Sequence, residues 1–406
     1  MTDVANRDFG LEAAAETSTP VAKAASKRFF VLDAWRGICA TCVALFHLPL
    51  LSNIYAAPFV RDSYLFVDFF FVLSGFVIEH AYGSRIRNAE GAKIFLIRRF
   101  ARVWPLHAAM LLVLIVTEIG KAMSLAAYHG PINAPPFTGA TSVPAIVYNL
   151  LLVNALGIYD HGTWNSPGWS ISVEFYTYVV FAITYLATPR RHFYAAVMLS
   201  VAGAVLLACL SRQYIGATND FGFFRCLYGF FLGNLVYAVY RERPGFLKSA
   251  GTQGSYTALE VTAIAVIILF VTEAGEGPAT MAAPLIFAFG VYVFALEGGA
   301  VSKFMSSAPF RLVGALSYSI YMVHFVYFNT LSRVLKIFEA QLGIHFYQRS
   351  VGNEEAWLWS MDGYKAATVD LLIFLLLASS IGLAYLTYTF IEKPGRRWLE
   401  NRLLKR

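Results

Sequence analysis

The sequence predicts an all-α, polytopic transmembrane protein with about ten membrane spans and a short re-entrant helix. Of its 406 residues, 58% are hydrophobic and only 14% are charged, whereas soluble domains have roughly 25% charged residues. The mean hydropathy is +0.57. The apolar residues also gather into runs of about 17–25 residues, the length that crosses a bilayer. The lipid bilayer is therefore the expected surroundings of the chain.

Three regions are expected along the chain. Residues 1–28 are rich in Ala, Thr and Ser and lack an apolar run, which predicts a disordered cytoplasmic tail rather than a signal peptide. A transmembrane domain at 29–391 and a basic cytoplasmic tail at 392–406 follow. The ten expected spans lie near 29–51, 64–82, 103–123, 169–187, 193–211, 222–240, 257–273, 280–297, 313–335 and 367–391.

The distribution of Lys and Arg orients these spans. If the N-terminus is inside and the apolar stretch 144–159 enters the membrane without crossing it, most of the 32 Lys and Arg residues fall in cytoplasmic loops. If that stretch crossed, every later loop would change sides and the bias would disappear. Both termini are therefore expected in the cytoplasm. The net charge of +7 then reflects topology, and no nucleic-acid partner is expected.

The first span carries charged and titratable groups within DAWRGICATCVALFH, residues 33–47. Arg36 and His47 are eleven residues apart, so they share a helical face at a separation of about 16 Å along the axis. Asp33 precedes Arg36 by three residues and is placed to form an ion pair with it. A structural ion pair with a hydrogen-bonded histidine explains these residues as well as a functional site does.

The second span ends in VDFFFVLSGF, in which Ser74 and Gly75 interrupt an aromatic run. Small residues let another backbone or a ligand approach closely. A helix-packing notch is the favoured interpretation, and a ligand-facing position is the alternative.

Three arginines, Arg98, Arg99 and Arg102, gather in FLIRRFARVWPLH, immediately before Pro105. The proline is expected to open the third span. Arg98 and Arg102 lie one helical turn apart, which suits two guanidinium groups holding one phosphate-bearing ligand. Contacts with anionic lipid headgroups are the alternative.

The stretch TWNSPGWSISVEFYTY opens the fifth span. Asn165 belongs to its turn, Trp169 suits the membrane interface, and Glu174 lies about a turn and a half into the apolar helix. By the topology above, Glu174 has a depth similar to that of His47. The two groups are therefore expected to form a hydrogen-bonded carboxylate–imidazole dyad.

Late in the chain, SYSIYMVHF places Ser317, Tyr321 and His324 on one helical face. This face is polar enough to line a cavity. Hydrogen bonding between helices explains it equally well.

Six motifs in this order resemble the acyltransferase 3 family of membrane acyltransferases: R-x10-H, FFFVLSGF, RRFAR, WSISVEF, SYSIYMVH and FIEKPGRR. The resemblance covers roughly residues 29–398. Phe175 and His107 depart from residues common in the family. The resemblance implies transfer of an acyl group, usually acetyl from cytoplasmic acetyl-CoA, to a hydroxyl of an extracytoplasmic or lipid-linked glycan such as an exopolysaccharide or O-antigen. It also implies a multi-pass protein of the bacterial inner membrane, of the stand-alone class without an SGNH-type domain.

The resemblance also implies residue roles. Arg36 and His47 match the essential pair of the family, and Glu174 matches the acidic residue of its WSxSxE motif; these three are the expected catalytic residues. The residues expected to hold the acyl-CoA are Arg98, Arg99, Arg102 and Ser74. Those expected to contact the acceptor are Trp169, Ser170, Ser172, Asn165, His324 and Tyr321. Acyl-CoA is the expected co-substrate, and no metal is expected.

Two routes of transfer stay open, because His47 is suited either to take the proton of the acceptor hydroxyl, the favoured route, or to carry the acyl group covalently. A transporter or flippase of a lipid-linked sugar or small molecule is the rival from another class, since it also needs buried charges. The membrane-bound O-acyltransferases are a second enzymatic rival, although they lack this motif order. Aromatic residues of the outer loop, among them Trp359, are expected in the headgroup belt, and stacking on sugar rings is the alternative. The sequence leaves a homo-oligomer open.

Overall fold

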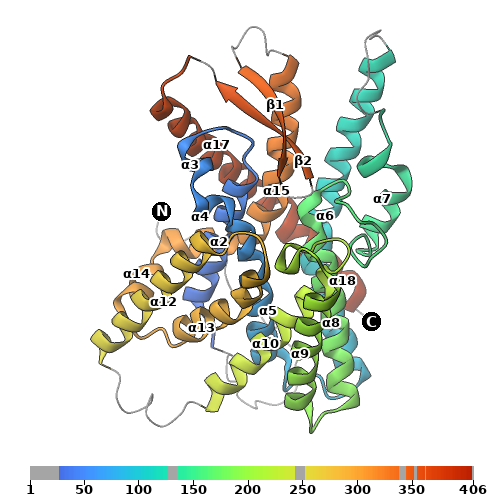
Figure 1. Cartoon of the computed structure of the whole chain (residues 1–406). Helices are drawn as coiled ribbons and strands as arrows, with labels where there is room; N and C mark the ends of the chain where they lie inside the picture. The colour runs from blue at the N-terminus through green and yellow to red at the C-terminus, as the bar shows by residue number, and fades with distance from the viewer. Residues whose placement is uncertain are drawn as a thin grey trace.

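The computed structural model of the chain describes residues 27–126, 135–242, 252–337, 344–351, 354–361 and 363–404 (Figure 1). The expected disordered tail thus lies almost wholly outside the described residues. Within these ranges the chain is helical apart from its turns and one two-stranded hairpin. The predicted all-α membrane fold is confirmed except for this hairpin, which the sequence analysis did not anticipate.

The long helices follow the apolar runs. They are α2 (Phe30–Phe46), α5 (Phe66–Tyr82), α6 (Ala89–Ala126), α8 (Trp169–Ala187), α9 (His192–Leu210), α10 (Gly222–Glu242), α12 (Gln253–Glu273), α13 (Ala283–Ala295), α15 (Ala308–Ile337) and α17 (Ala366–Thr387). Among the described residues, eight segments are long and apolar enough to cross a membrane, and each coincides with an expected span. The other two expected spans correspond to α2 and α15.

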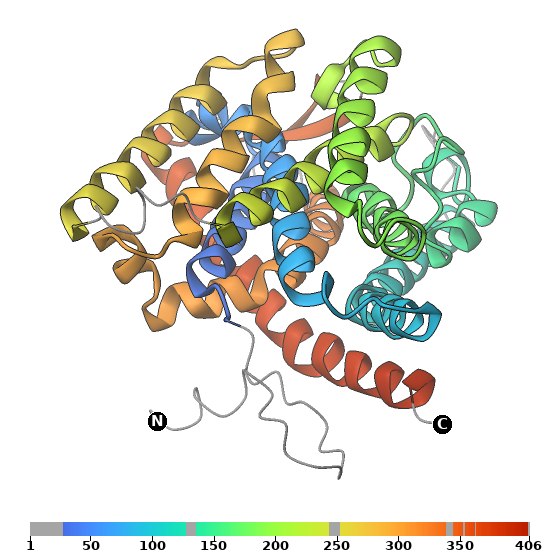
Figure 2. The same cartoon turned by 90° about the horizontal axis from the view of Figure 1, so that it is seen from below.

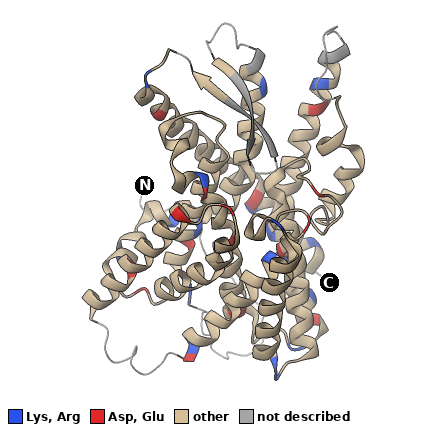
Figure 3. Cartoon of the chain, viewed as in Figure 1, with Lys and Arg blue, Asp and Glu red and all other residues tan. Residues whose placement is uncertain are grey.

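Short elements connect the long helices. They are α3 (Asn53–Ala56), α4 (Pro58–Arg61), η1 (Ser63–Leu65), η2 (Gly139–Thr141), α7 (Val143–Leu150), η3 (Ser166–Gly168), η4 (Tyr214–Gly216), η5 (Pro278–Ala282), α14 (Ala300–Met305), β1 (Ile344–Val351), β2 (Glu354–Met361), η6 (Tyr388–Glu392) and α18 (Lys393–Leu404). Figure 3 shows charged residues mainly near helix ends and at the centre of the bundle, with long uncharged stretches between them. This pattern suits helices that meet lipid.

Helix α2 lies inside the bundle and packs most extensively on α15. A Cβ atom at Gly37 would lie 2.6 Å from the carbonyl carbon of Val313, and one at Gly314 would lie 2.5 Å from the carbonyl oxygen of Asp33. Glycine at both positions lets the two backbones meet closely, as is common between membrane helices. The close approach brings Arg36 against the polar face of α15.

Gly75 forms the packing notch that the sequence suggested. A Cβ atom at this position would overlap the carbonyl oxygen of Phe230 in α10. Its neighbour Ser74 faces a pocket instead, as described below. Gly75 thus serves helix packing, whereas Ser74 lies at a position that faces a pocket.

Replacing Gly75 with leucine is expected to destabilise the protein by at least about 1–3 kcal/mol, the range for overpacking a filled interior. The added side chain must push α5 and α10 apart, because its first atom already meets backbone. Thermal unfolding of the detergent-solubilised protein measures the change. Gly382→Leu in α17 is the matched control, since nothing lies within 4 Å of a Cβ there. Equal losses in the two variants would show that the α5–α10 contact is not the cause.

Helix α6 runs without a break through Pro105, so the expectation that this proline opens the third span is wrong. Membrane helices tolerate an internal proline when neighbouring groups satisfy the backbone that it frees. Here the ring lies against α18, and a Cβ atom at Gly395 would be 2.6 Å from the Cβ of Pro105. The three arginines of RRFAR consequently project from a helix rather than from a loop.

The apolar stretch 144–159 contains the eight-residue helix α7 except for its first residue, and turns follow the helix. Eight residues of α-helix extend about 12 Å, less than half of the hydrocarbon thickness. This length agrees with the prediction that the stretch does not cross the membrane. The sides of the membrane on which the termini lie stay a prediction.

The described part of the expected basic C-terminal tail, residues 392–404, is helical. Helix α17 continues through one π-helical turn, η6, into helix α18. Figure 2 shows α18 along the outside of the bundle, and it packs against α6. The extra residue in a π turn shifts the helical register, and it leaves the side chain of Glu392 buried.

Strands β1 and β2 pair antiparallel in the expected outer loop. The backbone N–H of Trp359 donates to the carbonyl of Pro49 at 2.6 Å, and the N–H of Leu51 donates to the carbonyl of Trp359 at 2.8 Å. The hairpin is thereby joined to the segment that directly follows α2. Trp359 itself is buried, and its ring N–H donates to Ser332 Oγ at 3.0 Å. Its predicted place in the headgroup belt is therefore wrong.

Candidate active site

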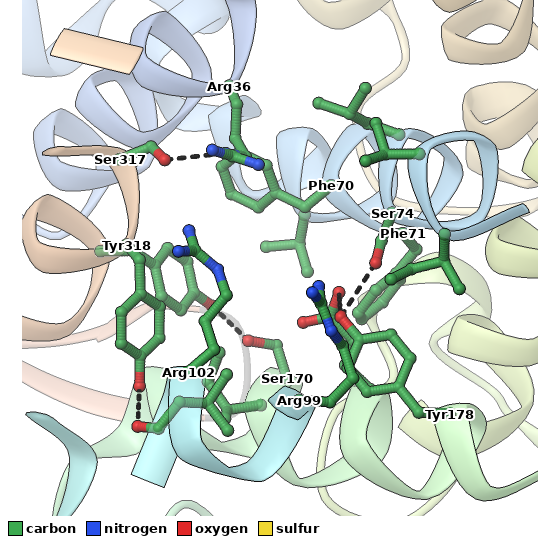
Figure 4. A pocket seen from close by; sticks show the side chains of 18 residues that line it. Arg36, Phe70, Phe71, Ser74, Arg99, Arg102, Ser170, Tyr178, Ser317 and Tyr318 are labelled. Atoms are coloured by element: carbon green, nitrogen blue, oxygen red, sulfur yellow. Dashed lines mark hydrogen bonds between the residues drawn. The ribbon is translucent and has the colours of Figure 1, made fainter. Parts of the chain in front are cut away.

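A pocket opens between five helices, α2, α5, α6, α8 and α15, and holds most of the predicted site residues (Figure 4). Its polar lining consists of three arginines, one glutamate, three serines and three tyrosines. These residues are Arg36, Arg99, Arg102, Glu174, Ser74, Ser170, Ser317, Tyr178, Tyr318 and Tyr321. Figure 4 shows the three arginine side chains reaching into the same space from α2 and α6.

Two side chains hold the guanidinium of Arg36, one from helix α15 and one from its own helix α2. Its Nε donates to Ser317 Oγ of α15 at 2.8 Å. One terminal nitrogen lies 3.1 Å from Asp33, so the expected ion pair is confirmed. Asp33 also accepts from Arg28 at 3.1 Å. The carboxylate therefore serves two cations, and the side chain of Arg36 keeps 28% of its surface exposed toward the pocket.

Of the three arginines of RRFAR, Arg99 and Arg102 line the pocket. Arg99 donates to the hydroxyl of Tyr82 at 3.2 Å, and Arg102 lies 3.8 Å from a carboxylate oxygen of Glu392. Arg98 does not line the pocket, so its expected pairing with Arg102 around one ligand is not seen there. Around the helix axis, residue 102 lies between residues 98 and 99. The pocket therefore faces the side of α6 that carries Arg99 and Arg102 rather than the side of Arg98.

The predicted dyad between Glu174 and His47 is wrong. Glu174 accepts a hydrogen bond of 2.7 Å from Tyr178, whose hydroxyl also lies 3.0 Å from Ser74 Oγ. Its side chain thus lies at the arginine-lined pocket. The direction in which a side chain points depends on helix packing, which its expected depth in the membrane does not specify.

His47 is paired instead with His324 of α15. Nδ1 of His47 lies 2.9 Å from the carbonyl oxygen of Val43 and 3.2 Å from Nε2 of His324. Nδ1 of His324 lies 3.1 Å from the carbonyl oxygen of Ile320. Each carbonyl requires a proton on the Nδ1 beside it, so Nε2 of His324 is an acceptor. Nε2 of His47 then carries a lone pair that neither of these contacts uses.

Tyr321 links this histidine pair to the pocket. It lines the pocket, and its ring centre lies 5.8 Å from that of His324. Ser170 donates to its hydroxyl at 2.9 Å. Ser317, Tyr321 and His324 therefore do share one face of α15, as the sequence predicted. That face runs from Arg36 at one end to His47 at the other.

Of the residues expected to contact the acceptor, Trp169 lies elsewhere. It is buried, and its ring covers the guanidinium of Arg225 at 5.2 Å. Arg225 in turn pairs with Asp68 at 2.8 Å, with both side chains almost wholly buried. The expectation that Trp169 lies at the interface is wrong. The tryptophan covers a buried ion pair that was visible in the sequence only as two charges within apolar runs.

Ser172 and Asn165 hydrogen-bond to neighbouring backbone segments rather than line the pocket. Ser172 Oγ donates to the carbonyl of Leu152 at 2.6 Å. Asn165 Nδ2 donates to the carbonyl of Met322 in α15 at 3.1 Å. Neither residue is among those that line the described pocket, so neither has the surface to contact a substrate there.

Glu392 was missed by the sequence analysis. It is buried, accepts a 2.7 Å hydrogen bond from Ser319, and lies beside Arg102. Glu392 belongs to the motif FIEKPGRR, which carries the family resemblance but assigns this residue no function. Its function as a partner of the pocket arginine depends on the π turn, which the sequence did not reveal.

Comparison with known proteins decides the family. A family model described as an acyltransferase domain matches residues 30–389. The chain belongs to the acyltransferase 3 family. Together with its apolar helices, this membership makes it an integral, multi-pass membrane acyltransferase. No solved structure matches the chain significantly.

Three curated relatives are similar in sequence to parts of this acyltransferase 3 family member. It is 32% identical over 170 residues to "Protein 2 in picA locus" of Rhizobium radiobacter, covering 38% of this chain and 82% of that protein. It is 25% identical over 384 residues to "Acyltransferase MdmB" of Streptomyces mycarofaciens, covering 88% and 84%. It is 23% identical over 333 residues to "Peptidoglycan O-acetyltransferase OatA" of Listeria monocytogenes, covering 75% of this chain and 50% of the relative.

Proposed function

We propose that the protein transfers an acetyl group from cytoplasmic acetyl-CoA to a hydroxyl of an extracytoplasmic or lipid-linked glycan. The observation that carries this proposal is the polar face of α15, which joins the arginine-lined pocket to the His47–His324 pair. A donor that enters beside the arginines can thus reach a base along one continuous face. Two relatives support the chemistry, since one is named an acyltransferase and another a peptidoglycan O-acetyltransferase.

The pocket suits the slender part of the donor. Its volume is about 120 Å³, below the roughly 300–1,000 Å³ of sites that enclose a whole drug-sized ligand. Such a space holds only part of the donor, such as the acyl-bearing end of its pantetheine arm, whereas the nucleotide must stay outside. The lining guanidinium groups of Arg99 and Arg102 then bind phosphate oxygens near the mouth.

The histidine pair supplies the base. Nε2 of His47 takes the proton of the acceptor hydroxyl as the hydroxyl oxygen attacks the thioester carbonyl. The bond from the carbonyl carbon to sulfur then breaks, and the CoA thiolate receives the proton. His324 acts as a positioning residue, because its Nε2 accepts from His47 and keeps the proton of His47 on Nδ1.

Transfer of label from radiolabelled acetyl-CoA tests the function. The purified protein in detergent or vesicles is incubated with labelled donor and a bacterial surface-glycan extract, and the products are separated from the donor. We expect base-labile label in the glycan fraction, as an O-ester gives. Label that stays in acetyl-CoA, or that appears only as free acetate, would overturn the proposal.

Arg102→Gln is expected to weaken the binding of CoA about 10- to 100-fold, because a hydrogen bond to a charged group contributes about 1.5–3 kcal/mol. Glutamine still offers a donor to Glu392, so the surroundings keep a partner. Calorimetric titration of the solubilised protein with CoA measures the affinity. Arg98→Gln is the matched control, expected to change the affinity less than about threefold. An equal loss of CoA affinity in the two variants would show that Arg98 and Arg102 hold the ligand together, as the sequence predicted.

A further inference from the structure

Arg61, the last residue of α4, lies close to the histidine pair. Its guanidinium carbon is 4.5 Å from the ring centre of Tyr55 and 5.1 Å from that of Phe46. The ring of Phe46 is in turn 4.8 Å from the imidazole of His47. The guanidinium and the imidazole are therefore within about 10 Å of each other.

The Arg61 guanidinium lies over two aromatic rings and forms no ion pair within 4.0 Å among the described residues. Other arginines of the bundle do have a carboxylate within 4.0 Å: Arg36, Arg102, Arg225 and Arg333. Nη1 of Arg61 is buried and makes no hydrogen bond in the part of the chain that the structure describes. The carboxylate of the adjacent Asp62 interacts with the backbone of Gly275 and, more weakly through its charge, with Arg61.

A buried donor without an acceptor is unfavourable by about 1–3 kcal/mol, and a ligand oxygen would remove this penalty. The contacts with Phe46 and Tyr55 are made to ring faces, and Nη1 keeps N–H groups that no acceptor among the described residues takes up. Such N–H groups suit the oxygens of a carboxylate or a phosphate.

We propose that Arg61 binds an anionic group of the acceptor, a carboxylate or phosphate carried by the glycan, while a nearby hydroxyl of the same acceptor lies at His47. This inference rests on the proposed function and names the acceptor class. The separation of the two groups suits an acidic substituent on the reacting sugar or on its neighbour. Binding of that substituent by Arg61 orients the acceptor hydroxyl toward His47. Part of the binding free energy is thereby used to position the reacting groups.

Matched pairs of acceptors test the inference. One pair is a uronic-acid oligosaccharide and its carboxyl-reduced form, and the other is a phosphorylated oligosaccharide and its dephosphorylated form. The wild-type protein is expected to favour the anionic member of one pair at least tenfold in kcat/KM, a ratio that corresponds to about 1.4 kcal/mol. Arg61→Gln is expected to reduce this ratio below about threefold, and Arg61→Lys to keep part of it.

Arg212→Gln is the control, because Arg212 is an exposed arginine that does not line the pocket; it should keep the full ratio. A ratio lost in the uronate pair assigns a carboxylate, and one lost in the phosphate pair assigns a phosphate. Equal use of both members by the wild type, or an unchanged ratio in Arg61→Gln, overturns the inference while the proposed function stands. Failure to label any acceptor overturns both.

Discussion

Replacing His47 with alanine is expected to slow acyl transfer about 10²- to 10⁴-fold, the range for losing a positioned general base. Nδ1 of His47 is engaged by Val43 and His324, so Nε2 is the basic nitrogen of the pair that stays available to a substrate. The pocket arginines lie elsewhere, and CoA affinity should change little. Initial rates of label transfer from acetyl-CoA, with CoA titrations alongside, measure both quantities.

His107→Ala is the matched control for this experiment. His107 is more deeply buried than His47, contacts the backbone of Asn149 and does not line the pocket. Its replacement should affect stability more than the rate per folded molecule. Similar rates in His47→Ala and in the wild type would contradict the base. An acetyl group trapped on His47 when no acceptor is present would replace direct transfer by the carrier route.

Breaking the Asp68–Arg225 pair is expected to have the largest effect on stability. The side chains of Asp68 and Arg225 are 0% and 1% exposed, and the guanidinium makes three hydrogen bonds of 2.8–3.2 Å to the carboxylate. Arg225→Met should lower the free energy of unfolding by about 3–5 kcal/mol, because it leaves a buried carboxylate unpaired. Thermal unfolding followed by tryptophan fluorescence measures the loss.

The double variant Asp68→Leu/Arg225→Met separates two explanations. Replacing both charges by apolar side chains of similar volume removes the unpaired carboxylate, and such swaps are often neutral or stabilising. The double variant is therefore expected to be more stable than Arg225→Met alone. A double variant that is less stable than the single one would show that the pair itself, with the Trp169 ring over it, stabilises the bundle.

Relations within one helix could be predicted from the sequence. The pairing of Asp33 with Arg36 and the common face of Ser317, Tyr321 and His324 both follow from helical geometry. The apolar runs likewise marked the long helices, because the length needed to cross a bilayer is fixed. These predictions needed no knowledge of which helices are neighbours.

Relations between helices could not be predicted. Glu174 was assigned to His47 by depth alone, yet the contact between α2 and α15 gives that histidine a second histidine. Arg98 and Arg99 differ only by a rotation of 100°, so their functions depend on how α6 is turned in the bundle. Glu392 faces inward because of a π turn, which has no composition of its own. These three differences concern the azimuth of a side chain, whereas the start of α6 and the β1–β2 hairpin concern the position and type of an element.

The bridge between the hairpin and the segment after α2 has a consequence for the entropy of the reaction. Trp359 holds Pro49 and Leu51 by two backbone hydrogen bonds, only two to four residues after His47. With α2 on its other side, the proposed base is held by regular hydrogen bonding both before and after it along the chain. Its conformational freedom is therefore given up once, during folding, and not again in each turnover. Because the base is already ordered, the free energy of acceptor binding is used to orient the acceptor and not to order the enzyme.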